Sequence, residues 1–143
     1  MFLLKIFISF LFLLYFAFCD LKKREVENWP IFVYFLVAVG FVFFDGVSLF
    51  PDLVYSSVWI VFVLMMYHFD FYGGADCKVF IVFCLMFPMQ FILVLLMMFF
   101  FAVGYSVIGR VLFFNRVLEI EKGVPLLFCF LIGFICFMVS LIL

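Results

Sequence analysis

The chain has 143 residues and a net charge of −1, and it is 73% hydrophobic and 12% charged, with a mean hydropathy of +1.54. A soluble domain carries about 25% charged residues, because much of its surface must face water. The composition therefore argues against a water-soluble fold, and the charge gives no indication of nucleic-acid binding. We expect the lipid bilayer to be the solvent of this chain.

The apolar runs that reach the length of a membrane helix are, in chain order, Met1–Cys19, Trp29–Phe44, Leu53–Phe69, Val79–Gly109 and Val124–Leu143. About 20 apolar residues cross a bilayer as a helix. The first run lacks the small residues that a signal-peptide cleavage site needs before Cys19. We therefore expect it to remain as a permanent first helix.

The fourth run is too long for one span, and its interruption by Pro88 and Gln90 indicates a break. We expect a short helix, Asp76–Phe87, followed by a full helix, Met89–Phe113. A simple count of the apolar runs gives five spans, whereas the break gives six.

The basic residues favour six spans. With the N-terminus outside, every Lys and Arg except Lys5 then lies in a cytoplasmic loop or at its edge. Five spans would place the Arg110–Lys122 loop outside, against the positive-inside rule. The sequence thus predicts an all-α integral membrane protein. We expect a six-transmembrane-helix bundle with one short fourth helix, forming a single domain over residues 1–143 with no soluble domain.

Two aspartates lie where apolar runs meet polar sequence, Asp20 after the first run and Asp76 before the fourth. An ionisable group near membrane depth is expensive and marks a candidate functional site. The six-span topology places both on the cytoplasmic face, where a helix bundle can bring them together as an acid/base pair. Each aspartate alone could instead be a helix cap. Asp70, six residues before Asp76, is a rival for the second catalytic role.

The residues around Asp76 suggest a local role in positioning it. Gly73 and Gly74 allow backbone shapes that are closed to other residues and a close approach by a neighbouring helix or a bound peptide. A helix that starts near Asp76 would favour its anion. None of the five cysteines forms a Cys-x-x-Cys pair, so we expect neither a metal site nor a cofactor.

The two aspartates and their surroundings carry a resemblance to a known family. The layout Asp-Leu-Lys-Lys-Arg-Glu-Val-Glu-Asn-Trp at 20–29, the Gly-Gly-Ala-Asp-Cys-Lys at 73–78, Phe87-Pro88 and Val124-Pro125 occur in this order. Together they resemble the type IV prepilin peptidases, in particular the compact archaeal prepilin/preflagellin peptidases. Glu27 departs from the pattern, because many relatives have Pro there, and the first loop can therefore differ in shape.

The resemblance implies an aspartic endopeptidase at the cytoplasmic face of the cell membrane. Asp20 and Asp76 would activate water between them, with Gly73, Gly74 and Lys78 as positioning residues. The implied partners are the basic leader (signal) peptides of prepilins or preflagellins, also called archaellins, and the lipid bilayer. Neither the substrate-binding residues nor the oligomeric state nor the acid and base roles within the pair follow from the sequence.

Two other functions remain open from the residues. One is a non-enzymatic membrane subunit of a pilus or secretion system, for which the aspartates would be dispensable. The other is another intramembrane protease of the Gly-x-Gly-Asp type. Such proteases place a Tyr-Asp in the middle of a span, whereas Asp20 follows Cys19 at the end of one.

Overall fold

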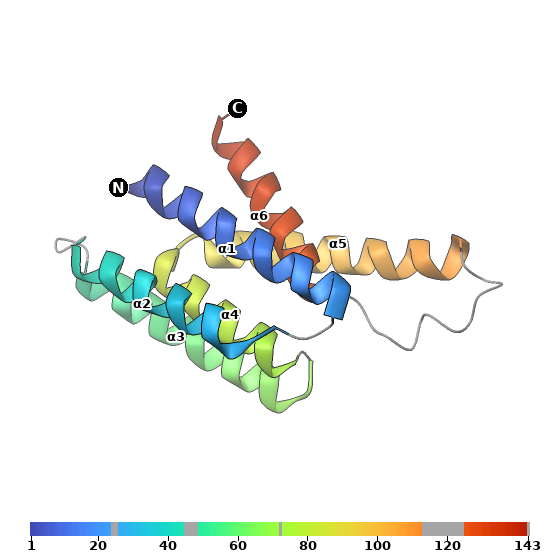
Figure 1. The fold of residues 1–143 in the computed structure, drawn as a ribbon, viewed down its shortest axis with the longest axis horizontal. Helices are drawn as coiled ribbons and strands as arrows, with labels where there is room; N and C mark the ends of the chain where they lie inside the picture. The colour runs from blue at the N-terminus through green and yellow to red at the C-terminus, as the bar shows by residue number, and fades with distance from the viewer. Residues whose placement is uncertain (24–25, 45–48, 72, 113–124, 143) are drawn as a thin grey trace.

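A computed structural model describes residues 1–23, 26–44, 49–71, 73–112 and 125–142 (Figure 1). The described residues form six helices and no strand, which confirms the all-α class: α1 (Phe2–Lys23), α2 (Asn28–Phe44), α3 (Leu49–His68), α4 (Gly74–Met86), α5 (Phe91–Leu112) and α6 (Leu126–Ile142). Some residues used in the topology and motif arguments lie outside the described residues, among them Arg24, Glu25, Phe113, Arg116, Lys122 and Val124.

The expected break in the fourth apolar run is confirmed. The N–H of Phe87 donates to the carbonyl oxygen of Phe83 at 2.9 Å and ends α4, and the N–H of Phe91 donates to the carbonyl oxygen of Phe87 at 3.0 Å where α5 begins. Pro88 has no N–H and cannot continue the ladder of hydrogen bonds, so the chain turns between the two helices. In contrast, α1 holds neither Pro nor Gly and runs past its apolar stretch to Lys23.

The short helix α4 lies inside the bundle. Its 13 residues span about 20 Å at 1.5 Å per residue, less than the roughly 30 Å of a hydrocarbon core. It packs against both α2 and α3, while α6 packs against α5 and α1. Most side chains from Cys77 to Met86 are buried, so α4 is apolar on nearly every side and is enclosed by its neighbours.

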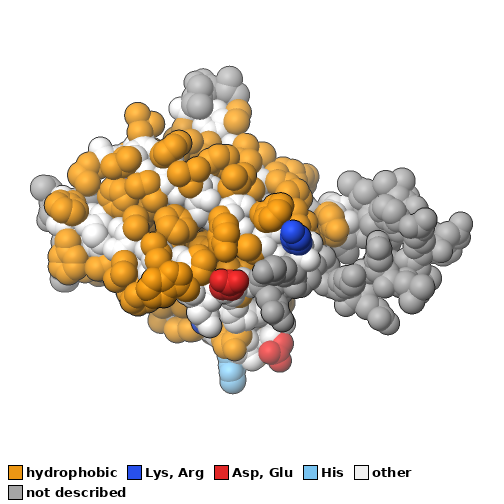
Figure 2. All heavy atoms as spheres, in the orientation of Figure 1, with side chains coloured by type: hydrophobic (Ala, Val, Ile, Leu, Met, Phe, Trp, Pro, Cys, Tyr) orange, Lys and Arg blue, Asp and Glu red, His pale blue; other side chains and the backbone are white. Residues whose placement is uncertain are grey.

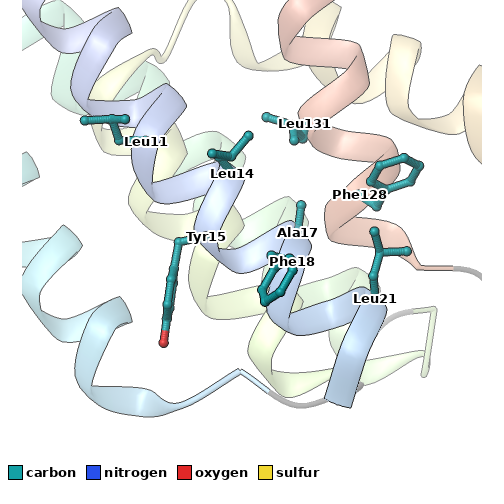
Figure 3. Close-up of a pocket in the computed structure, with 8 residues that line it drawn as sticks. All are labelled: Leu11, Leu14, Tyr15, Ala17, Phe18, Leu21, Phe128 and Leu131. Atoms are coloured by element: carbon teal, nitrogen blue, oxygen red, sulfur yellow. The ribbon is translucent and has the colours of Figure 1, made fainter.

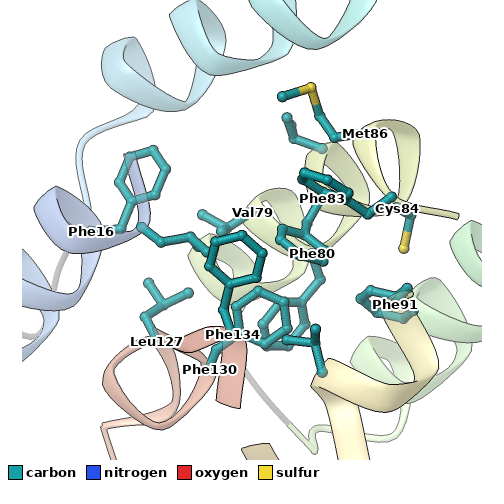
Figure 4. Close-up of a cluster of buried hydrophobic side chains, with 14 of the residues drawn as sticks. Phe16, Val79, Phe80, Phe83, Cys84, Met86, Phe91, Leu127, Phe130 and Phe134 are labelled. Atoms are coloured by element: carbon teal, nitrogen blue, oxygen red, sulfur yellow. The ribbon is translucent and has the colours of Figure 1, made fainter. Parts of the chain in front are cut away.

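A cluster of aromatic rings joins α4 to α5 and α6. The ring centroid of Phe83 lies 4.9 Å from that of Phe130, 5.4 Å from that of Phe134 and 6.3 Å from that of Phe91. Figure 4 shows these rings, with Phe80, converging between the helices. Aromatic pairs at such distances contribute about 0.5–1.5 kcal/mol each beyond the area that they bury. This cluster holds the short helix in place against the last helix.

The contact between α5 and α6 depends on Gly133. A Cβ atom at this position would lie 3.0 Å from both the backbone nitrogen of Met98 and the carbonyl oxygen of Val94. Within a bilayer, helices associate through close packing, and small residues permit it. Gly133 therefore lets the two backbones approach where no larger residue fits.

The outer surface is mostly apolar. Trp29 is 70% exposed and Phe44 is 80% exposed, and hydrophobic side chains cover most of the face drawn in Figure 2, with the charged ones toward one side. Apolar surface on this scale is a lipid-facing or interaction surface. Where side chains are described, Phe2–Lys22 is the one helical stretch long and apolar enough to cross a membrane, and the other apolar stretches there have 10–17 residues each. Six spans thus remain a prediction.

Candidate active site

Asp20 lies in the last turn of α1 and points into the protein. Its side chain is 9% exposed, and among the described residues Asp20 is the one charged residue that is buried. One of its carboxylate oxygens, Oδ2, accepts a hydrogen bond from the backbone N–H of Leu127 at 3.1 Å. The first and last helices are therefore joined through this carboxylate.

The donor to Asp20 is one of the free N–H groups at the start of α6. The N–H of Cys129 donates to the carbonyl oxygen of Pro125 at 3.1 Å, so the first turn of α6 begins at Pro125. The first N–H groups of a helix have no partner within the helix, and a side chain at its start usually accepts one of them. Proline has no acceptor in its side chain. The carboxylate of Asp20 takes this role from another helix.

Asp76 lies in the first turn of α4, before the apolar run that starts at Val79. Its Oδ2 accepts a hydrogen bond from the N–H of Gly73 at 3.2 Å. The pKa of the Asp76 carboxyl is raised from 3.8 to about 6. Burial is the largest cause, and the negative charge of Asp20 also raises the pKa, whereas the hydrogen bond from the Gly73 N–H lowers it. Asp20 is therefore within electrostatic reach of Asp76.

The two glycines before Asp76 do not have the backbone conformation that the sequence suggested. Gly73 has φ −73° and ψ 163°, an extended conformation open to other residues, and Gly74 does not have the positive φ that favours glycine. The expectation of a special backbone shape is wrong. A Cβ at Gly73 would lie 3.4 Å from the Oδ2 of Asp76, at ordinary contact distance, so the structure shows no steric need for glycine there either.

Lys78 connects the starts of two helices. Its Nζ donates a hydrogen bond to the side-chain oxygen Oδ1 of Asn28 at 2.6 Å. Asn28 is the first residue of α2, and Lys78 is in the second turn of α4. The contact ties the loop after Asp20 to the helix that carries Asp76.

Asp70, the rival for the second catalytic role, has a local structural task. It is exposed and has a positive φ of 58°. The N–H of Asp70 donates to the carbonyl oxygen of Tyr67 at 3.0 Å, and the N–H of Phe71 donates to the carbonyl oxygen of Met66 at 3.2 Å. This is the Schellman arrangement that ends a helix, with an aspartate in the position where glycine is commonest. The carboxylate that raises the pKa of Asp76 is that of Asp20.

The site thus consists of two carboxylates from distant parts of the chain, at the end of α1 and the start of α4. Each accepts a backbone N–H, and both lie where polar and apolar sequence meet. Among the residues that the structure describes, no three His, Cys, Asp or Glu side chains are grouped closely enough to hold a metal ion. Such a pair can hold one shared proton between an acid and a base. The α6 donor was missed by sequence reasoning, although Val124-Pro125 marked the start of that helix.

Both aspartates lie within the part of the chain that matches a known protein family. The model of the type IV leader peptidase family matches residues 7–108, which include most of α1, all of α2, α3 and α4, and most of α5. The search of curated proteins gave no match, and neither did the search of solved structures.

Proposed function

Because the chain belongs to the type IV leader peptidase family, we propose that it is an aspartic endopeptidase whose dyad is Asp20 and Asp76. Its substrates on this proposal are prepilins or preflagellins, from which it removes the short basic leader. The observation that carries the proposal is the effect of Asp20 on Asp76. A carboxylate in α1 raises the pKa of a carboxyl in α4, as expected for two acids that face one reaction centre.

The effect of Asp20 on the pKa of Asp76 suggests their roles in the proposal. Because the negative charge of Asp20 raises the pKa of Asp76, Asp20 serves in the proposal as the ionised carboxylate, which draws a proton from the attacking water. The raised pKa of Asp76 favours its protonated form, which donates to the oxygen of the scissile carbonyl. As the peptide bond breaks, the proton that Asp20 took up passes to the leaving amine, and a hydroxyl group of the tetrahedral intermediate returns a proton to Asp76.

The proposed setting is the cytoplasmic face of the cell membrane. The helix ends that carry Asp20, Asn28 and Asp76 lie on one side of the molecule, and the charged side chains visible in Figure 2 gather there. The largely apolar surface of the remaining helices suits a multi-pass bundle in lipid. A protease in this position would cut a leader at the membrane surface and leave the apolar part of its substrate in the bilayer.

The test is processing of a prepilin-type substrate, meaning a short basic leader followed by an apolar segment of about 20 residues. The chain is co-expressed with this substrate, and the shift in substrate size is followed on a gel. We expect Asp20→Asn and Asp76→Asn each to lower the rate by about 10²–10⁴-fold, the usual contribution of proton transfer. The matched control is Asp70→Asn, which removes an exposed carboxylate and keeps a residue that tolerates positive φ.

Two results would contradict the proposal. If both dyad variants process the substrate as fast as the wild type, the dyad assignment is wrong. If the folded wild-type chain processes no prepilin-type substrate, the alternative function as a non-enzymatic membrane subunit is favoured. The control variant separates a specific loss of the dyad from a general effect of removing a charge.

A further inference from the structure

The last helix, α6, contacts both of the helices that carry the aspartates. On α1, the Oδ2 of Asp20 accepts the N–H of Leu127 at 3.1 Å. About one turn later in α6, the ring centroid of Phe130 lies 4.8 Å from that of Phe80 on α4. Phe80 follows Asp76 by four residues, so the two lie one turn apart on the same side of α4. The first turns of α6 therefore connect the end of α1 to the start of α4.

These contacts lie inside the protein. Leu127 is 1% exposed, and the rings of Phe80 and Phe130 have no exposed surface. Figure 4 shows Leu127 and Phe130 in the first turns of α6, with Phe80 of α4 nearby, and Figure 3 shows these turns beside the last turns of α1. A packed interior has low compressibility and transmits strain. A shift of α6 would therefore act on Asp20 and on the helix of Asp76 together.

The sequence at the start of α6 leaves its first turn in need of an acceptor from elsewhere. Leu127 is the second residue of α6, and the side chain just before a helix usually accepts an N–H at this position. That residue is Pro125, whose ring carries no acceptor. A buried N–H without a partner costs free energy. The hydrogen bond to Asp20 therefore serves α6 as well as the carboxylate.

We propose that the start of α6 positions Asp20 within the dyad, with the N–H of Leu127 as the positioning group. The inference rests on the proposed function and adds to it an element beyond residues 7–108, the part of the chain that the family model matches. An aspartate side chain has several staggered rotamers, and a donor fixed in a packed helix selects among them. Placement matters for the rate, because a displacement of about 1 Å can cost about a hundredfold.

The first test gives α6 a cap of its own. An Asn side chain accepts the N–H two residues further along the chain, so Pro125→Asn should take the N–H of Leu127 from Asp20. The matched control is Pro125→Ala, which also removes the ring and adds a backbone N–H but brings no acceptor. On the prepilin-type substrate, we expect kcat per folded protein to be about 10–100-fold lower in Pro125→Asn than in Pro125→Ala. KM should be similar in the two variants, because the change acts on the base and not on substrate binding.

The second test removes the donor itself. An ester in place of the amide of Leu127 replaces the N–H by oxygen and keeps the side chain, and the same change at Leu126 is the control. We expect kcat with the ester at Leu127 to be about tenfold lower than with the ester at Leu126, as for the loss of a hydrogen bond to a charged group. Equal kcat values within either pair of variants would overturn the inference. A loss that appears in KM alone would also overturn it, because the contact would then serve binding.

A third test does not depend on cleavage. Asp20→Ala removes the acceptor for Leu127, and its effect on chemical unfolding is measured in the Pro125→Ala and Pro125→Asn backgrounds. We expect it to raise the unfolding equilibrium constant about fivefold more in Pro125→Ala, where α6 has no cap of its own. Equal changes in the two backgrounds would overturn the inference, because α6 would then not depend on Asp20. A fivefold difference in a chain that cleaves no prepilin-type substrate would uphold the contact and overturn the proposed function instead.

Discussion

Replacing Asp20 by Asn should lower the pKa of Asp76. The pKa of the Asp76 carboxyl is about 6 instead of 3.8, and at about 1.36 kcal/mol per pKa unit this corresponds to about 3 kcal/mol of preference for the protonated form. Burial is the larger cause and the charge of Asp20 the smaller. Asn keeps the shape of the side chain and an oxygen for the N–H of Leu127, and removes the charge. We therefore expect a fall of roughly one pKa unit or less, to a value still above 3.8.

The measurement is a titration of the Asp76 carboxyl in reconstituted protein, followed by its carbonyl infrared band. The band is assigned by its disappearance in Asp76→Asn. The control is Asp70→Asn, which should leave the titration of Asp76 unchanged. An unchanged or higher pKa in Asp20→Asn would refute the reasoning, because the two carboxylates would then be beyond electrostatic reach. A fall all the way to 3.8 would refute the larger role of burial.

Three further predictions concern pH and packing. Because Asp76 loses its proton as the pH rises through about 6, kcat/KM should fall about tenfold per pH unit above that value, and a rate that climbs from there would contradict the assigned donor. Gly133→Ala should lower the free energy of unfolding in detergent by about 1–3 kcal/mol, because the added Cβ would meet the backbone of α5. The control Gly104→Ala has nothing within 4 Å of its added Cβ and should raise the free energy of unfolding by about 0.5–1 kcal/mol. Equal effects of the two substitutions would refute the close contact at Gly133. Lys78→Met and Asn28→Ala should each lower the free energy of unfolding by about 0.5–1 kcal/mol, and the double variant should lose less than the sum of the two. Additive losses would show that the hydrogen bond between Lys78 and Asn28 contributes nothing to stability.

The parts of the site that could be predicted from the sequence are those that local patterns encode. Pro88 interrupts an apolar run, and a missing N–H breaks a helix wherever it falls, so the two helices on either side could be expected. Asp20 and Asp76 stood out because a charge is costly beside so much apolar sequence. Their placement on helix ends follows from the same transition between apolar and polar residues.

The parts that could not be predicted depend on contacts between distant segments. The N–H that binds Asp20 belongs to Leu127, and a backbone group has no signature in the sequence. Asp70 looked like a second acid by type and position, but its task follows from a positive φ that only the folded chain reveals. For Gly73, the residue type suggested conformational freedom, whereas the structure shows an ordinary extended backbone.

The hydrogen bond from Leu127 to Asp20 has a consequence for how inactive variants are interpreted. The family match ends at residue 108, yet this donor comes from α6, beyond the match. A chain truncated before α6 would retain both acids of the proposed dyad and lose one hydrogen-bond donor to Asp20. In the same way, Asp20→Ala removes both a charge and a helix cap, while Asp20→Asn removes the charge alone. The difference between these two variants separates the structural role of the Asp20 carboxylate from its role in catalysis on the proposed function.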